Sequence, residues 1–146
     1  MKGLIQRVSQ ASVEISGSCA GQIGPGILLL LGIEKNDTQA VADKLLNKIL
    51  AYRIFSDSDG KMNLSLQQTA GGLLIVSQFT LVAETMKGLR PGFSNGASPE
   101  QGIALYNYFV AQAQKLHAPV ETGEFGADMK VQLINDGPVT FMLEAH

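Results

Sequence analysis

Residues 77–80, with the sequence Ser-Gln-Phe-Thr, carry two hydroxyl groups and an amide within four positions. A serine or threonine hydroxyl becomes an effective nucleophile when a general base lies within hydrogen-bond reach. The chain offers two histidines as bases, His117 and His146, and neither stands in a recognisable triad context. These side chains alone therefore do not define a hydrolase.

A second distinctive segment, residues 135–140, contains Gly137 followed by Pro138. Taken alone, it is typical of a connection between two strands of a hairpin. Residues 77–81 can likewise be the polar-edged end of an apolar strand. Because short motifs are weak evidence, local sequence favours these structural interpretations over a functional one.

Metal and cofactor sites are not indicated by the sequence. Cys19 is the single cysteine, and together with two histidines it forms no spacing typical of zinc ligands. Residues 57–60 resemble half of a calcium loop, but Lys61 occupies a position where an oxygen ligand is needed. We expect a surface turn there, no metal ion and no cofactor.

The strands that must position these segments are visible as short apolar or alternating runs. We expect strands at residues 3–8, 11–15, 27–33, 73–76, 131–134 and 139–143. The first two are expected to form a hairpin. The run 27–33 is apolar at nearly every position, which indicates a central strand buried on both faces. The last two are expected to flank a turn at 135–138.

The first of two expected helices is amphipathic. Its apolar residues Val41, Leu45 and Ile49 recur every four positions, and Asn36 or Asp37 can cap its beginning.

The second helix is predicted to begin at Ser98, with Pro99 in the first helical position and Gln101 placed for a capping box. Pro119 marks its end. Strands and two main helices interleave along the chain, so we predict an α/β domain with a mixed β-sheet.

Length and composition favour one cytoplasmic domain. The 146 residues, 45% of them hydrophobic, suffice for a single core spanning residues 1–146. The longest apolar run, 27–31, is too short to span a bilayer, and Gln6 and Arg7 interrupt any signal-peptide region. The net charge of −2 lacks the basic excess of proteins that grip long nucleic acids. If the protein binds RNA, it should contact a small part of it.

Segments distributed over almost the whole chain together resemble the D-aminoacyl-tRNA deacylase family, in order and at its spacings. They are residues 4–8 (LIQRV), 52–57 (YRIFSD), 60–63 (GKMN), 77–81 (SQFTL), 96–99 (GASP) and 135–140 (NDGPVT). One departure is Gly92, where the family usually has serine. This departure bears on the stiffness of the loop and not on activity.

The resemblance implies an enzyme that hydrolyses the ester joining a D-amino acid, or glycine, to the 3′ end of tRNA. It implies that the pocket for the aminoacyl group and the terminal adenosine is lined by Ser77, Gln78, Phe79 and Thr80. It further implies that Gly137 and Pro138, joined by a cis peptide bond, enter the active site of the other subunit. An obligate homodimer with two composite sites follows. The resemblance implies that Arg7 supports the loop that carries Gly137 and Pro138. It also implies that Phe125 and Met129 lie next to the adenine.

The implied filter works by collision. Two carbonyl oxygens from the Gly137 and Pro138 loop would clash with an L side chain, while a D side chain or glycine passes. For the reaction, positioned water and backbone N–H groups near Phe79 and Thr80 can stabilise the oxyanion, with the ribose 2′-OH as helper. The competing mechanism uses Thr80 as covalent nucleophile, for which the sequence shows no general base.

Two other classes of function remain open on the sequence alone. One is a noncatalytic dimeric binding module that uses the same two segments as a ligand groove. The other is a general esterase, which the absence of a Gly-x-Ser-x-Gly elbow disfavours.

Overall fold

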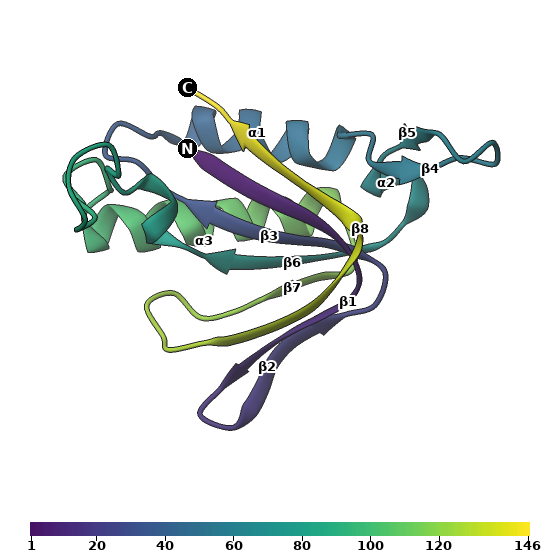
Figure 1. Ribbon diagram of the computed structural model, residues 1–146, viewed down its shortest axis with the longest axis horizontal. Helices are drawn as coiled ribbons and strands as arrows, with labels where there is room; N and C mark the ends of the chain where they lie inside the picture. Colours follow the sequence, from purple (N-terminus) through teal and green to yellow (C-terminus); the bar gives the residue numbers. More distant parts are fainter.

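The longest strands, β1 (Lys2–Ile15) and β8 (Lys130–Glu144), lie side by side and antiparallel in the computed structural model, which describes residues 1–146 (Figure 1). The expected break between strands 3–8 and 11–15 does not occur, so that prediction is wrong. The polar Ser9 and Gln10 are exposed positions where the pairing with β8 shifts register, and the strand continues through them. The hairpin instead joins β1 to β2 (Ser18–Ile23).

The sheet is mixed, as predicted. Its order is β2-β1-β3-β6-β7, with β8 on the other side of β1. β3 (Gly26–Gly32) runs antiparallel to β1 and parallel to β6 (Gly72–Ser77), which is parallel to β7 (Val120–Thr122). β3 is central and almost entirely buried, which confirms the interpretation of its continuous apolar run.

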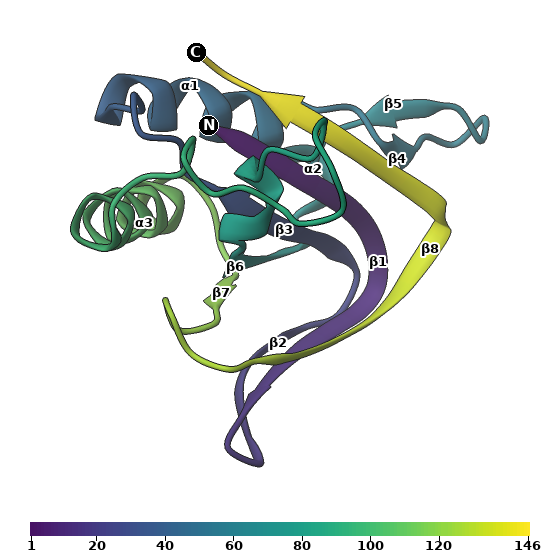
Figure 2. The same ribbon diagram turned by 60° about the vertical axis from the view of Figure 1, so that its left-hand side comes forward.

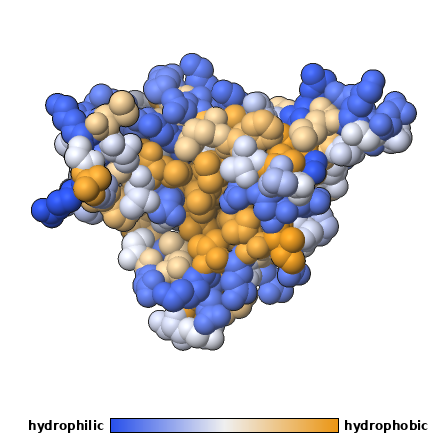
Figure 3. Space-filling model, in the orientation of Figure 1, coloured by the Kyte–Doolittle hydropathy of each residue, from blue (hydrophilic) through white to orange (hydrophobic).

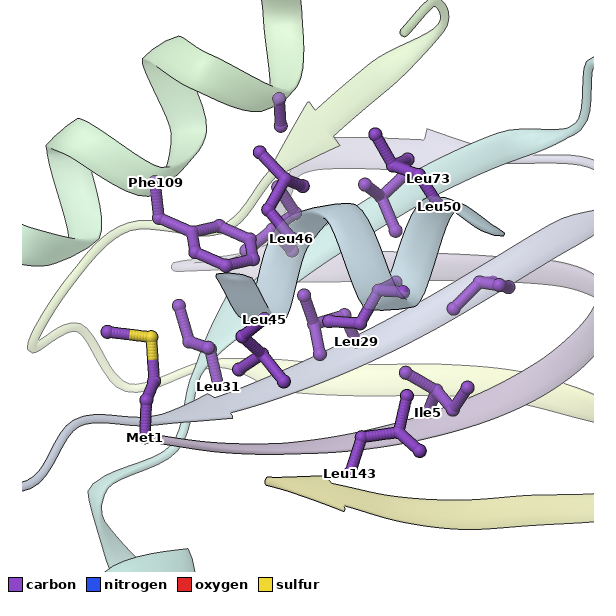
Figure 4. Close-up of a cluster of buried hydrophobic side chains, with 14 of the residues drawn as sticks. Met1, Ile5, Leu29, Leu31, Leu45, Leu46, Leu50, Leu73, Phe109 and Leu143 are labelled. Atoms are coloured by element: carbon purple, nitrogen blue, oxygen red, sulfur yellow. The ribbon is translucent and has the colours of Figure 1, made fainter. Parts of the chain in front are cut away.

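Both main helices, α1 (Gln39–Ala51) and α3 (Pro99–Leu116), pack against one face of this sheet. Figure 4 shows Leu45 and Leu46 of α1 and Phe109 of α3 gathered with Ile5 and Leu29 of the sheet. A second apolar cluster on the opposite face contains strand residues without helical ones. It forms because β1 and β8 curve strongly, so that the sheet partly folds onto itself (Figure 2).

The start of α1 differs from the prediction. Thr38 is the N-cap, and its side chain accepts a hydrogen bond from the Val41 N–H. Asp37, which the sequence offered as a cap, instead accepts hydrogen bonds from the Met1 ammonium group and the Glu34 N–H, each at 2.7 Å. A buried charged partner from a distant part of the chain therefore determines the role of Asp37.

The start of α3 agrees with the prediction in part. Ser98 is the N-cap and Pro99 is the first helical residue. The Ser98 hydroxyl accepts from the Gln101 N–H, but the Gln101 side chain donates to the carbonyl oxygens of Lys35 and Asp37 in place of closing a capping box. Gln101 thereby links the first turn of α3 to the segment that precedes α1.

The segment 135–138 is not a turn between two strands, because β8 runs through it as one strand with a register shift against β1. Side chains provide hydrogen bonds where the register shift interrupts the backbone pairing. The Asn135 side-chain oxygen accepts from the Val139 N–H at 2.7 Å, and Arg7 Nε donates to the Asp136 carbonyl oxygen at 2.8 Å. The Gly137–Pro138 peptide bond is cis.

The remaining elements are small. β4 (Phe55–Ser56) and β5 (Met62–Leu64) form a hairpin, followed by α2 (Leu66–Thr69) and, after β6, the 3-10 helix η1 (Phe79–Val82). The hairpin carries the expected surface turn: the Asp57 carboxylate accepts from Asn63 and from the N–H groups of Lys61 and Asp59, and these hydrogen bonds lower its pKa. None of the helices has both the length and the hydropathy that a membrane-spanning helix requires.

Candidate active site

A cavity of about 520 Å³ lies at the carboxyl ends of the parallel strands β3 and β6. Open α/β sheets commonly bind ligands at this end of their strands. Its walls come from the end of β6 and η1, the start of α3, and the segment before β8, including Ser77, Gln78, Phe79, Phe125 and Met129. Figure 3 shows hydrophobic surface gathered in the middle of one face, with hydrophilic residues around it.

A second hollow, of about 620 Å³, lies over β1, β2 and β8. Strand residues such as Ser9, Gln10 and Gln132 line it, and it contains none of the site residues that the sequence predicts. We regard the first cavity as the site, because it combines an apolar lining with polar groups at strand ends.

The entry to η1 leaves two backbone donors without acceptors. The Gln78 N–H still continues the sheet by donating to the Leu31 carbonyl oxygen at 2.8 Å. The N–H groups of Phe79 and Thr80, the first two in η1, have no hydrogen-bond acceptor within the chain. Such free N–H groups at the start of a helical turn can stabilise negative charge.

Thr80 is exposed and lies outside the residues that line the cavity. Its hydroxyl oxygen accepts a hydrogen bond from the Gln78 side-chain amide, which cannot take up a proton. Neither histidine lines the cavity: His117 Nε2 lies 2.6 Å from the Gly71 carbonyl oxygen, and His146 lies beside Glu144. The structure thus brings no histidine base to Thr80.

Phe125 is held against α3. Its ring packs on Tyr106, with centroids 5.7 Å apart, and the Tyr106 hydroxyl donates to the Ile75 carbonyl oxygen in β6. Burial raises the pKa of Tyr106 to about 12, so it remains a hydrogen-bond donor. The ring also covers Gly102, where an added Cβ would lie 2.9 Å from the Phe125 Cζ.

Met129 is backed by a glycine in the same way. A Cβ added at Gly123 would lie 2.5 Å from the Met129 sulfur. Sequence reasoning missed both Gly102 and Gly123, since a glycine in a helix or strand end by itself indicates only weak local propensity. Together they leave the space that the Phe125 and Met129 side chains occupy.

The cavity wall that contains Ile33 and Ala97 is supported by the amino group of Met1, a contact that sequence reasoning also missed. Met1 is fully buried, and its ammonium donates to Glu34 and Asp37 at 2.7 Å and to the Ala145 carbonyl oxygen at 2.9 Å. Partial burial opposes ionisation of Glu34, but the hydrogen bond and charge of the ammonium outweigh it and lower the Glu34 pKa. The adjoining Ile33 carbonyl oxygen accepts from the Ala97 N–H at 3.0 Å, and both residues line the cavity.

Arg7, Gly137 and Pro138 lie apart from this cavity, since none of them lines it. Arg7 donates to the carbonyl oxygens of Asp136 and Ile54, each at 2.8 Å, and so fixes the residue that precedes Gly137. Gly137 and Pro138 are exposed. Within one chain, the residues predicted from the sequence therefore form two separate groups.

Comparison with known proteins gives consistent results. Residues 4–144 match the sequence model of the family described as D-Tyr-tRNA(Tyr) deacylase. The chain is 62% identical over 144 residues, 99% of each chain, to the D-aminoacyl-tRNA deacylase of Cellvibrio japonicus (strain Ueda107). It is 64% identical over 143 residues, 98% of this chain and 99% of the relative, to the enzyme of the same name from Pseudoalteromonas atlantica (strain T6c / ATCC BAA-1087).

Two solved structures have the same fold. The c-Myc DNA Unwinding Element Binding Protein is 42% identical, with a TM-score of 0.94 over 99% of this chain and 98% of that one. A probable eukaryotic D-amino acid tRNA deacylase has a TM-score of 0.85 over 98% of both chains at 17% identity, which supports the fold alone.

Proposed function

The chain belongs to the D-Tyr-tRNA(Tyr) deacylase family, and we propose that it is a D-aminoacyl-tRNA deacylase. The enzyme hydrolyses the ester bond of D-aminoacyl-tRNA, and of mischarged glycyl-tRNA, to the free amino acid and tRNA. The observation that carries this proposal is the identity of more than 60% over nearly the full chain to proteins of that name. The single domain of residues 1–146 acts in translation quality control.

The cavity supports an assignment of roles. The terminal adenine lies between Phe125 and Met129, and the aminoacyl group lies beside Ser77 and Gln78, at the other wall of the same cavity. An aminoacyl ester is already activated, so the protein needs chiefly to place a water molecule and stabilise the oxyanion. The unpaired N–H groups of Phe79 and Thr80 are suited to the second task, and the substrate's 2′-OH assists the first.

Selectivity comes from a second copy of the chain. In the proposed homodimer, the exposed Gly137 and Pro138 of one subunit enter the cavity of the other and close it. Their carbonyl oxygens exclude an L side chain by collision, whereas a D side chain or glycine is accepted. Arg7 supports this arrangement, because its hydrogen bond to the Asp136 carbonyl oxygen holds the loop in place.

The proposed substrate indicates the cellular compartment and the binding partners of the enzyme. The enzyme acts in the cytoplasm, where aminoacyl-tRNA is made and used, and it binds the 3′ end of the tRNA. The net charge of −2 supports a limited contact with RNA. We propose that neither a metal ion nor an organic cofactor takes part.

The test compares one tRNA charged with a D-amino acid and with its L counterpart. The proposed enzyme releases the D-amino acid and spares the L-aminoacyl-tRNA. A noncatalytic binding module would hydrolyse neither, and a general esterase would hydrolyse both and also a simple amino acid ethyl ester. Glycyl-tRNA in the same assay measures the predicted tolerance of an absent side chain.

A further inference from the structure

We propose that the cavity rim formed by Phe79, Phe93 and residues 84–92, here called the rim loop, binds the unpaired nucleotides that precede the terminal adenosine of the substrate. This inference rests on the proposed function. In it, the aromatic rings stack on bases, and Lys87 and Arg90 neutralise the phosphates that connect them.

The aromatic part of the rim is exposed and already paired. Phe79 is 64% and Phe93 47% exposed, although both are large apolar side chains. Their ring centroids lie 5.1 Å apart at an interplanar angle of 51°. Both residues line the cavity that Phe125 also lines. A strand of RNA that leaves this cavity past the two rings therefore meets exposed ring surfaces on which bases can stack.

The rim loop places two exposed cationic side chains next to these rings. Two hydrogen bonds between Glu84 and Gly92 close its base, and the loop leads directly into Phe93. Lys87 and Arg90 are exposed and make no ion pair or side-chain hydrogen bond. The Glu84 carboxylate is engaged by the Met86 N–H at 2.8 Å.

The rim loop projects from the body of the molecule beside the start of α3 (Figure 1). The same edge of the space-filling view mixes strongly hydrophilic with hydrophobic atoms (Figure 3). Its apolar side chains, Met86 and Leu89, are 88% and 103% exposed. Lys35 is a third cation near the rim. Its backbone N–H donates to the carbonyl oxygen of Asn95, which is two residues after Phe93.

This combination favours single-stranded RNA over other occupants. Proteins bind single strands through exposed aromatic rings that stack on bases, combined with cationic side chains that follow the backbone. The position beside the cavity also fits, since the nucleotide chain must leave the cavity across one of its edges. A second copy of this chain is the alternative occupant, and the experiment below separates the two.

The experiment uses two substrates: intact D-aminoacyl-tRNA, and the D-aminoacyl ester of adenosine alone, which carries no preceding nucleotides. The double variant Lys87→Ala/Arg90→Ala should raise KM for the tRNA about tenfold and leave KM for the adenosine ester unchanged. Because each phosphate contact on a single strand contributes about 0.7 to the salt slope, the dependence of log KM on log salt should weaken by about 1.4. Phe93→Ala should raise KM for the tRNA roughly tenfold and, because Phe93 also lines the cavity, should raise KM for the adenosine ester by less.

The matched control is Lys48→Ala/Lys115→Ala, which removes the same charge from exposed helical positions away from the rim. Equal losses on both substrates, or an unchanged salt slope for the tRNA, would overturn the proposal. So would sedimentation showing that the rim variant dissociates, because the rim would then be a subunit contact. If the unmodified enzyme hydrolyses neither substrate, the proposed function itself is wrong.

Discussion

Phe125 and Met129 can occupy their positions because the neighbouring residues are glycines, which have no Cβ. Each side chain occupies space that a Cβ would fill, at Gly102 for the phenylalanine ring and at Gly123 for the methionine sulfur. Real Cβ atoms do not approach other atoms so closely, so any larger residue at either glycine must displace the side chain in front of it. The displaced side chain is part of the cavity wall where we place the adenine, so the shape of that wall changes.

Alanine at these glycines should therefore impair substrate binding without removing any group that contacts substrate. We expect Gly102→Ala and Gly123→Ala each to raise KM about tenfold, a loss of roughly 1.4 kcal/mol of binding free energy, while kcat changes little. Steady-state kinetics on D-aminoacyl-tRNA measures both constants. Gly24→Ala is the control, since a Cβ there meets no atom within 4 Å. Unchanged KM in both variants would contradict the placement of adenine between Phe125 and Met129.

Thr80 provides a separate test of the chemistry. Because its hydroxyl accepts from an amide and no histidine is near, we expect Thr80→Ala to retain kcat within about tenfold of the unmodified enzyme. Removal of a covalent nucleophile costs several powers of ten in other hydrolases. Single-turnover rates decide between the two. Isolation of an acyl ester on Thr80 from quenched reactions would establish the covalent mechanism instead.

Sequence could suggest candidate residues for the site but not how they are held. The segments 77–80 and 135–140 are recognisable because their residues are adjacent in the chain, and a family resemblance preserves such runs. The contact of Gly102 with Phe125 joins residues far apart in sequence. No local pattern encodes it, so it becomes visible only once α3 and the segment before β8 pack together.

At the scale of elements, one cavity wall depends on the buried contact between Met1 and the entrance of α1. The Asp37 side chain is 6% exposed and accepts hydrogen bonds from the Met1 ammonium and the Glu34 N–H. Asp37→Ala should lower the free energy of unfolding by roughly 3 kcal/mol, because it removes one partner of a buried charge pair. Urea denaturation measures this loss.

The charge-matched control for that experiment is Asp59→Ala, which removes an exposed carboxylate from the surface turn. We expect it to change the free energy of unfolding by less than about 0.5 kcal/mol. A similarly small effect for Asp37→Ala would mean that Glu34 and the Ala145 carbonyl oxygen hold the ammonium group by themselves.

The elements themselves were predictable where side-chain pattern decides the structure. β3 and the Ser98 N-cap of α3 agree with expectation because a continuous apolar run and a capping hydroxyl act locally. The first and last strands were each divided in two by the prediction. Polar residues at Ser9 and Gln10, and turn-forming residues at 135–138, are tolerated within β1 and β8 because bulges and the Arg7 and Asn135 side chains replace regular pairing.

At the scale of the whole molecule, the proposal requires two chains for each working site. Alone, the cavity and the Gly137 and Pro138 loop do not meet. A Cβ at Gly137 would lie 2.5 Å from the Val139 backbone nitrogen, so Gly137→Ala must shift this loop. We expect the ratio of D to L hydrolysis by the folded dimer to fall about tenfold or more. An unchanged ratio would place chiral selection elsewhere, in the walls near Ser77.

Mixed dimers test whether the loop acts on the partner subunit. Phe79→Pro removes a backbone N–H at the first position of η1, where proline is sterically acceptable, and should inactivate its own cavity. In a tenfold excess of this variant, about nine in ten Gly137→Ala subunits pair with an intact loop. Their hydrolysis of L-aminoacyl-tRNA should then fall while D hydrolysis persists. If mixing leaves the L rate unchanged, the loop acts within its own chain.

The pairing of β1 with β8 also has a consequence for how the protein is made. β1 leaves the ribosome well before β8, yet its outer edge, from Lys2 to Glu14, is covered only by residues 130–144. Until β8 emerges, the nascent chain therefore carries an open strand edge, the kind of surface that can pair with other strands. We expect such nascent chains to depend on chaperones until β8 emerges, and the Arg7 support of the Gly137 loop to form among the last contacts.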